Sequence, residues 1–121
     1  MRPRTVVFQN KIKASGINPL DSKIRVGQAA HAKRQVPAIL GIDLAGVVEA
    51  AGSSVQKFKL DDEVYGMAGG IGEVQGSLAE YAACDADLLA KKPVNLTMEE
   101  TAALPLIFIT ACRYFSRCCR C

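Results

Sequence analysis

The chain has 121 residues, of which 50% are apolar and 22% charged, and 15 Lys and Arg against 12 Asp and Glu give a net charge of +3. A chain of this length can bury a core of its own but is too short for two full domains. Acidic and basic residues are interleaved, so no nucleic-acid-binding surface is indicated. The longest apolar stretch, residues 102–112, is far shorter than the roughly 20 residues that cross a bilayer, so no membrane span is expected.

The first expected elements are a strand and a short helix. Residues 5–13 alternate apolar and polar side chains and predict a strand that ends at residues 14–16. Asn18 can cap a helix that Pro19 opens and Gly27 ends. The polar segment 28–35 is expected to be a surface loop. It contains His31, the single histidine, which is expected to be a solvated side chain because no nucleophile lies near it in the sequence.

The middle of the chain has the texture of an all-β domain. Short strands at 46–51, 63–66, 77–84 and 88–91 alternate with turn residues, which is typical of a sandwich or barrel rather than a parallel sheet. The glycine-rich run 68–76 is expected to be a hairpin loop, since its spacing fits no phosphate-binding motif.

Two helices are expected near the C-terminus. Thr97 and Glu100 have the spacing of a capping box, in which each side chain satisfies the free amide of the other residue. The helix that follows is expected to run to about Leu104. Pro105 breaks it, and a second helix is expected over residues 106–115.

Cysteine use divides the chain in two. Cys84 stands alone in the body, while Cys112, Cys118, Cys119 and Cys121 lie in the last ten residues. An odd number without paired spacing in the body indicates a reduced, cytoplasmic protein rather than a disulfide framework. The terminal cluster could in principle hold zinc. Adjacent cysteines and the lack of a nearby histidine favour an exposed, oxidisable tail instead.

Asp43 is the acidic residue that stands out, because it lies inside the apolar run 39–48. A carboxylate in such a position needs a hydrogen-bonding partner or a wet cleft. Asp43 is therefore a candidate site residue. The alternative is a structural carboxylate bonded to the amides of a turn.

Several ordered segments carry a family resemblance: KIKASGINPLDSKIRVG, VPAILGIDLAGVVEAAG, FKLDDEVYG, GSLAEYA, LAKKP and MEETAALPLIFITA. Over residues 11–111 the chain resembles the catalytic domain of the medium-chain dehydrogenase/reductase superfamily, in particular its zinc-independent quinone oxidoreductases. The resemblance implies a mainly β fold, a GroES-like, partly open β-barrel with short helices, two of them near the C-terminus. It also implies a parent enzyme that uses NADPH to reduce small-molecule quinones or activated alkenes and carbonyls.

The resemblance implies a site without metal. Asn18, Ile42-Asp43 and Leu106 match the positions that hold zinc in the alcohol dehydrogenases of the superfamily, and an amide with two hydrocarbon side chains cannot form a zinc site. It implies Asn18 and Asp43 as catalytic residues, with Asn18 beside the nicotinamide of NADPH and polarising the substrate oxygen. Thr110 would contact the cofactor. The residues implied as cleft support are Asp21, Ile42 and Leu106.

The resemblance also divides the chain into domains. Residues 1–111 are expected to form the GroES-like domain, with the family's first hairpin missing, and residues 112–121 an atypical cysteine-rich tail. The Rossmann domain is expected to be absent, so the chain alone is expected to be inactive. Asp61 stands where the family has glycine in a turn, which predicts a strained backbone.

The expected truncation predicts an interaction surface. Leu104, Leu106, Ile107 and Ile109 would be open to water, and the strand at 5–13 would have a free edge. The chain is therefore expected to form homo-oligomers, with elements exchanged between copies. The alternative to an oxidoreductase domain is a non-catalytic GroES-like module for interaction or oligomerisation.

Overall fold

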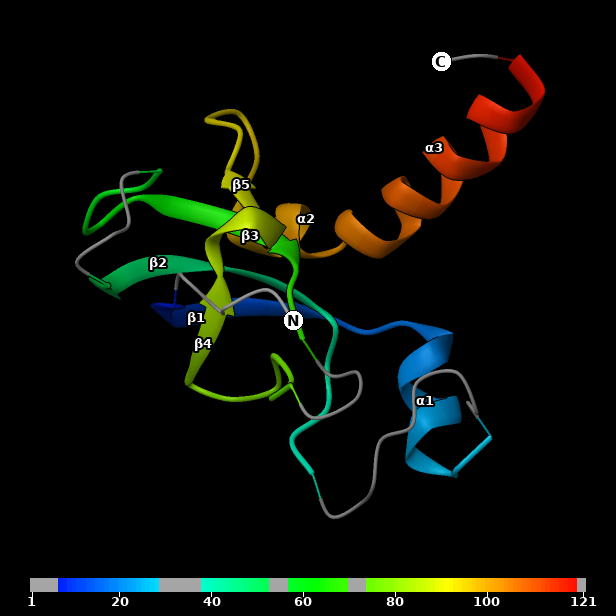
Figure 1. Ribbon diagram of the computed structural model, residues 1–121, viewed down its shortest axis with the longest axis horizontal. Coiled ribbons are helices and arrows are strands. Elements are labelled where there is room, and N and C mark those ends of the chain that lie inside the picture. The colour runs from blue at the N-terminus through cyan, green and yellow to red at the C-terminus, as the bar shows by residue number, and fades with distance from the viewer. Residues whose placement is uncertain (1–6, 29–37, 53–56, 70–73, 120–121) are drawn as a thin grey trace.

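The computed structural model describes residues 7–28, 38–52, 57–69 and 74–119 (Figure 1). Apart from residue 28, the expected loop at 28–35, with His31, lies outside these ranges. The strands are β1 (Val7–Gly16), β2 (Asp43–Ala51), β3 (Glu63–Met67), β4 (Tyr81–Asp85) and β5 (Leu89–Lys91). The helices are α1 (Pro19–Arg25), a 3-10 turn η1 (Ala86–Leu88), α2 (Met98–Ala102) and α3 (Pro105–Cys119).

The described strands form one antiparallel sheet in the order β4-β1-β2-β3-β5. The sheet does not close, and its edges are β4 and β5. The mainly β, antiparallel architecture with two helices near the C-terminus is confirmed. The free edge expected for the first strand is wrong, because β1 pairs with β2 on one side and β4 on the other.

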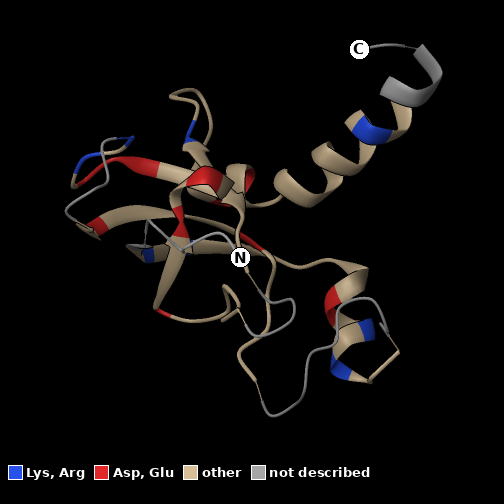
Figure 2. Cartoon of the chain, viewed as in Figure 1, with Lys and Arg blue, Asp and Glu red and all other residues tan. Residues whose placement is uncertain are grey.

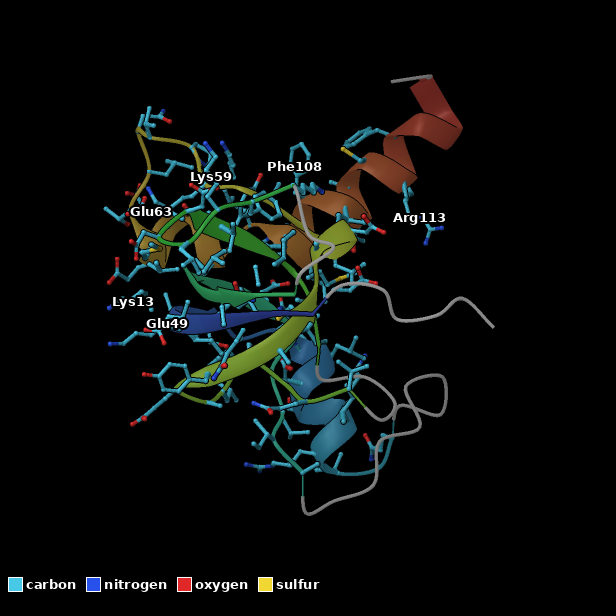
Figure 3. All side chains as sticks on the ribbon, turned by 60° about the vertical axis from the view of Figure 1, so that its left-hand side comes forward. Lys13, Glu49, Lys59, Glu63, Phe108 and Arg113 are labelled. Carbon is cyan, nitrogen blue, oxygen red and sulfur yellow. The ribbon has the colours of Figure 1, made fainter. Side chains whose placement is uncertain are left out.

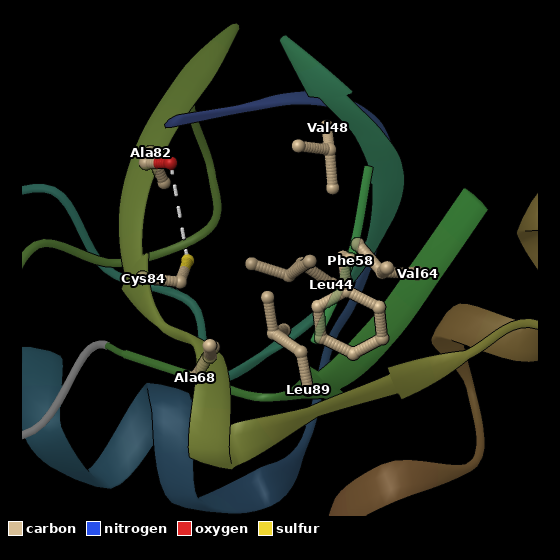
Figure 4. Packing of buried hydrophobic residues seen from close by; sticks show 9 residues of the cluster. Leu44, Val48, Phe58, Val64, Ala68, Ala82, Cys84 and Leu89 are labelled. Atoms are coloured by element: carbon tan, nitrogen blue, oxygen red, sulfur yellow. Dashed lines mark hydrogen bonds between the residues drawn. The ribbon is translucent and has the colours of Figure 1, made fainter. Parts of the chain in front are cut away.

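The main core lies on one face of the curved sheet (Figure 4). Its larger side chains include Leu44 and Val48 of β2, Val64 of β3, Phe58 and Leu89. All five are at most 5% exposed. A second cluster is built on Ile24 of α1 and Ile42, with Leu20, Leu40, Met67 and Leu106 packed against it. This second cluster joins α1 to the start of α3.

Three strand boundaries differ clearly from the sequence expectation, and the differences come from non-local pairing. β1 continues to Gly16, and β2 begins already at Asp43, because these two residues are register partners. A side chain at Gly16 would collide with the carbonyl oxygen of Ala102, so the glycine allows α2 to approach β1 closely. The fourth strand begins only at Tyr81. The backbone amides of Ser77 and Leu78 instead bond to the carbonyls of residues 41 and 40.

The predicted helix starts are confirmed, but α2 ends at Ala102 rather than near Leu104, and α3 runs from Pro105 to Cys119 rather than over residues 106–115. Asn18 is the N-cap of α1, and Gly27 follows its end with a positive φ of 78°. Glu100 N donates to Thr97 Oγ1 over 3.1 Å, and Thr97 N donates to Glu100 Oε1 over 3.2 Å. Pro105 opens α3, the position where its missing N–H costs least.

Helix α3 leaves the sheet at its first turn and extends away from it (Figure 1). Its described part carries little charge (Figure 2). Ile107 is 62% and Phe108 64% exposed, and Arg113 points away from the sheet (Figure 3). Among the described residues, no helix combines the length and the apolar character that crossing a membrane requires.

Candidate functional site

Three polar side chains are buried where β1 ends, α1 begins and β2 begins. Asn18 is 5%, Asp21 6% and Asp43 0% exposed. The pairing of Gly16 with Asp43 sets the start of β2 beside the end of β1, and Asn18 follows two residues later. The sheet register therefore brings together residues 25 positions apart in the chain.

Hydrogen bonds connect these side chains to each other and to α3. Asn18 Nδ2 donates to Asp43 Oδ2 over 3.0 Å, and Asn18 N donates to Asp21 Oδ2 over 2.8 Å. The backbone amide of Leu106 donates to Asp43 at 3.1 Å from Oδ1 and 3.3 Å from Oδ2. Asp43 therefore has the hydrogen-bonding partners that a carboxylate within an apolar run needs. The carboxylate is bonded to an amide side chain and to the first turn of a distant helix.

The electrostatics of Asp43 follow from this burial. Desolvation raises the pKa of the Asp43 carboxyl above its ordinary value of 3.8, and the nearby Asp21 raises it further. The bonds from Asn18 and Leu106 act in the opposite direction, because they favour the charged form. Burial has the largest effect, so Asp43 holds its proton to a higher pH than an exposed aspartate does.

Two serines that the sequence did not mark as site residues donate hydrogen bonds to the backbone oxygen of Asp43. Ser15 Oγ donates to the backbone oxygen of Asp43 over 3.1 Å, and Ser77 Oγ donates to the same oxygen over 2.8 Å. The two hydroxyls also contact each other. No sequence signal marks this pair, because Ser15 and Ser77 are 62 positions apart and meet only through the fold.

The residues at the positions matched to zinc ligands offer no metal site. Ile42 is fully buried, and Leu106 packs against the cluster that contains it. An isoleucine and a leucine have no donor atom for a cation. Within the described ranges, no group of three or more His, Cys, Asp or Glu side chains could hold a metal ion.

Thr110 is the predicted site residue that lies apart from the buried cluster. It is exposed on α3, one helical turn beyond Leu106. Residues four apart share a face of a helix, so Thr110 continues the line that Leu106 begins.

An apolar groove, which sequence reasoning missed, lies between α3 and the β5 edge of the sheet. It has a volume of about 340 Å³. Met67 belongs both to this groove and to the cluster around Ile42 and Leu106, so the groove adjoins the buried site. Its lining residues are Tyr65, Gly66, Met67, Asp87, Leu88, Leu89, Ala90, Leu104, Pro105, Phe108 and Ile109. They come from separate elements, so no local pattern marks them.

The chain is similar to several oxidoreductases. The family profile described as "Alcohol dehydrogenase GroES-like domain" matches residues 9–94. The 2-methylene-furan-3-one reductase of Solanum lycopersicum is 45% identical over 108 residues, which cover 84% of this chain and 27% of the relative. The chloroplastic NADPH-dependent alkenal/one oxidoreductase of Arabidopsis thaliana is 42% identical over 105 residues, with the same two shares. Quinone oxidoreductases of mammals are also among the relatives.

The fold has close counterparts among solved structures. An alcohol dehydrogenase superfamily protein from Novosphingobium aromaticivorans superposes with a TM-score of 0.93 at 48% identity, covering 100% of this chain and 37% of that one. The chain thus spans about a third of the length of the proteins it matches. With the sheet and helices described above, these likenesses confirm the GroES-like fold. The chain belongs to the alcohol dehydrogenase GroES-like domain family of the medium-chain dehydrogenase/reductase superfamily, and its relatives include quinone and alkenal oxidoreductases.

Proposed function

We propose that residues 1–111 are the substrate-side domain of an oxidoreductase that transfers a hydride from NADPH to quinones or to activated alkenes and carbonyls, without zinc. One observation carries this proposal. The buried Asn18 amide is hydrogen-bonded to Asp43, which also accepts from the Leu106 amide, while Ile42 and Leu106 offer only hydrocarbon where the resemblance expects the metal ligands of a zinc-dependent relative. The names of the relatives support the substrate class and the cofactor.

The chemistry requires a hydrogen-bond donor. When bound, NADPH supplies the hydride. The carbon that accepts it shifts an electron pair onto the substrate oxygen, which carries negative charge until a proton arrives from water. An N–H aimed at this oxygen stabilises the developing charge. Asn18 provides that donor, because its Nδ2 has two hydrogens and Asp43 engages one of them.

The other site residues have supporting roles. Asp43 is fully buried, so it acts on the substrate through Asn18. Asp21 fixes the backbone of Asn18, while Ile42 and Leu106 keep water from the amide. Thr110 places a hydroxyl on the exposed face of α3, where it contacts the nicotinamide end of the cofactor.

Binding is tested on the 121-residue chain by NMR. The probes are NADPH and tetramethyl-benzoquinone, whose ring carbons are all substituted so that the exposed Cys112 thiol does not add to them. We expect the side-chain amide signals of Asn18 to shift with each probe. Asn18→Ala should weaken binding about tenfold, the value of one good hydrogen bond.

The matched control is Asn95→Ala, which removes the same group from an exposed turn and should leave binding unchanged. The absence of any shift at Asn18 with millimolar probe would overturn the proposed site. The isolated chain is not expected to turn over substrate, and quinone-dependent oxidation of NADPH above the blank rate would contradict that part.

A second candidate function rests on the exposed face of α3. Leu104 is 39%, Ile107 62% and Phe108 64% exposed, which suits a non-catalytic interaction module and a homo-oligomer. Sedimentation of the chain tests this. Association that Ile107→Ser and Phe108→Ser abolish together would support the module. A monomer at high concentration would oppose it.

The cytoplasm is the proposed compartment, because the cysteine pattern suits a reducing environment. One relative, the alkenal/one oxidoreductase of Arabidopsis thaliana, is by its name a chloroplast protein. Imaging of a fluorescent fusion in the source cells distinguishes the two, and an organellar signal would contradict the proposal.

A further inference from the structure

The carboxylate of Asp43 joins three elements that lie apart in the sequence. It begins β2, accepts one hydrogen bond from the N-cap of α1 and accepts another from the first turn of α3. Leu106, the donor on α3, comes 63 positions after Asp43. With Asp43 at 0% exposure, water does not compete for these bonds.

The bond to Leu106 holds the start of α3. The first amides of a helix have no acceptor within the helix, and Pro105 before Leu106 has no N–H at all. A carboxylate at this end is also favoured by the helix dipole. Among the first six residues of α3, Pro105 is buried and Leu106 half-buried, while residues 107–110 are exposed. Asp43 is thus a main anchor of the helix.

The bond to Asn18 selects one of the two orientations of the amide. An ionised carboxylate accepts hydrogen bonds and cannot donate them, so Asn18 must turn Nδ2 toward Asp43. The backbone of Asn18 is held separately by Asp21. Asp43 therefore sets the donor orientation of the Asn18 side chain, and Asp21 fixes the Asn18 backbone.

We propose that Asp43 is a positioning residue that, as a carboxylate with two accepting oxygens, holds the Asn18 amide in its donor orientation and the start of α3 in place, so that both are released together. The relevance to catalysis rests on the function proposed for Asn18, whereas the coupling itself is a property of the chain without ligand.

Protonation is the natural way to break this coupling. Protonation at Oδ1 leaves the Leu106 amide only its longer contact of 3.3 Å to Oδ2, the oxygen that also accepts from Asn18. A neutral carboxyl is also a weaker acceptor than a carboxylate, so both N–H groups are held less strongly. Burial raises the pKa of Asp43, which moves this event toward neutral pH. The titratable group facing it is Asp21 on α1. The other partners of Asp43 are uncharged: Gly16 and Met67 pair with it in the sheet, Leu106 donates to its carboxylate, and Ser15 and Ser77 donate to its backbone oxygen.

The test compares two substitutions of the same kind in the 121-residue chain, Asp43→Asn and Asp21→Asn. The first leaves a single accepting oxygen and sets an NH2 group against one of the two donors. We expect the Leu106 amide to exchange with solvent about tenfold faster, as for the loss of one hydrogen bond. The Asn18 side-chain amide signals should move toward those of a free amide. Asp21→Asn should speed exchange at the Asn18 backbone amide and leave Leu106 unchanged.

A pH titration of the unsubstituted chain tests whether the two N–H groups respond together. A carboxylate that held only one of them would shift the signal of that one alone. The Leu106 amide and the Asn18 side-chain amide should shift with one common midpoint, above the ordinary range for aspartate. Separate midpoints, or no shift at one of the two, would overturn the proposal even if Asp43→Asn fails to fold. Neither measurement contains NADPH or a quinone, so its outcome is independent of whether the chain binds them.

Discussion

The ammonium group of Lys92 lies 3.2 Å from the carboxylate of Glu63, and the two side chains differ sharply in exposure, 7% for Lys92 and 54% for Glu63. Lys92 Nζ also donates to the backbone oxygens of Pro93 and Leu96. This one cation therefore joins the start of β3 to the segment between β5 and α2.

Lys92→Met is expected to lower the free energy of unfolding by about 2 kcal/mol, because it leaves two carbonyl groups without their donor. Glu63→Gln should cost less than about 1 kcal/mol, since Glu63 is half exposed and water replaces it. Urea unfolding of both variants measures the difference. Equal losses would show that the ion pair, and not the carbonyl bonds, stabilises this corner.

Asp61 has a φ of +69°, a conformation that favours glycine. Asp61→Gly is therefore expected to raise the free energy of unfolding by roughly 0.5–1 kcal/mol, the relief of the left-handed backbone less the added entropy of the unfolded chain. The matched control is Asp62→Gly, which removes a carboxylate that accepts from Lys59 N over 2.9 Å and should be destabilising. A loss of stability in Asp61→Gly would show that this side chain has a role of its own.

The sequence predicted what local signals encode. The reciprocal bonds of Thr97 and Glu100 need only four consecutive residues, and Asn18 with Pro19 marked the start of α1 in the same way. Strand ends were missed because they depend on partners. No residue pattern near Gly16 in the sequence predicts its pairing with Asp43.

The residues of the candidate site likewise divide into those that the sequence could identify and those that only the fold brings together. Asp43 could be singled out as a charge within an apolar run, and the family resemblance added Asn18. The bond from Leu106 to Asp43, the Ser15 and Ser77 hydroxyls and the apolar groove all join distant segments. Only the sheet register and the placement of α3 bring them together.

Gly16→Ala is expected to destabilise the chain by about 1–3 kcal/mol, the usual cost of forcing extra atoms into a packed place. Its new side chain would collide with the Ala102 carbonyl and lie against Asp43. Gly27→Ala is the control, because a side chain there meets nothing within 4 Å and only the positive φ opposes it. Thermal unfolding of both variants tests this. A smaller loss in Gly16→Ala would mean that α2 can move away from β1 at little cost.

Cys84 and Cys112 are expected to differ in reactivity. Cys84 is 3% exposed, and burial raises the pKa of its thiol, while Cys112 is exposed. Iodoacetamide reacts with the thiolate, so Cys84 should be alkylated at least about tenfold more slowly, as followed by mass spectrometry of their separate peptides. In urea the two rates should converge. A fast Cys84 under native conditions would mean that the β4 edge opens readily.

The stability of the chain should depend on pH through Asp43 in a definite direction. Because its pKa in the folded chain is raised above 3.8, the folded state binds the proton more tightly than the unfolded state does. The stabilisation is complete below pH 3.8 and is lost as the pH rises through the raised pKa. Asp43→Asn lacks this titration, so the unfolding free energy of the unsubstituted chain minus that of the variant should fall with pH across this window and then level off. A difference that rises with pH would mean that the bonds from Asn18 and Leu106 outweigh the burial of the charge. If the predicted direction holds, the ionised form of Asp43 lowers the stability of the folded chain while it orients Asn18. A loss of stability of this kind is expected where a buried charge is needed for function.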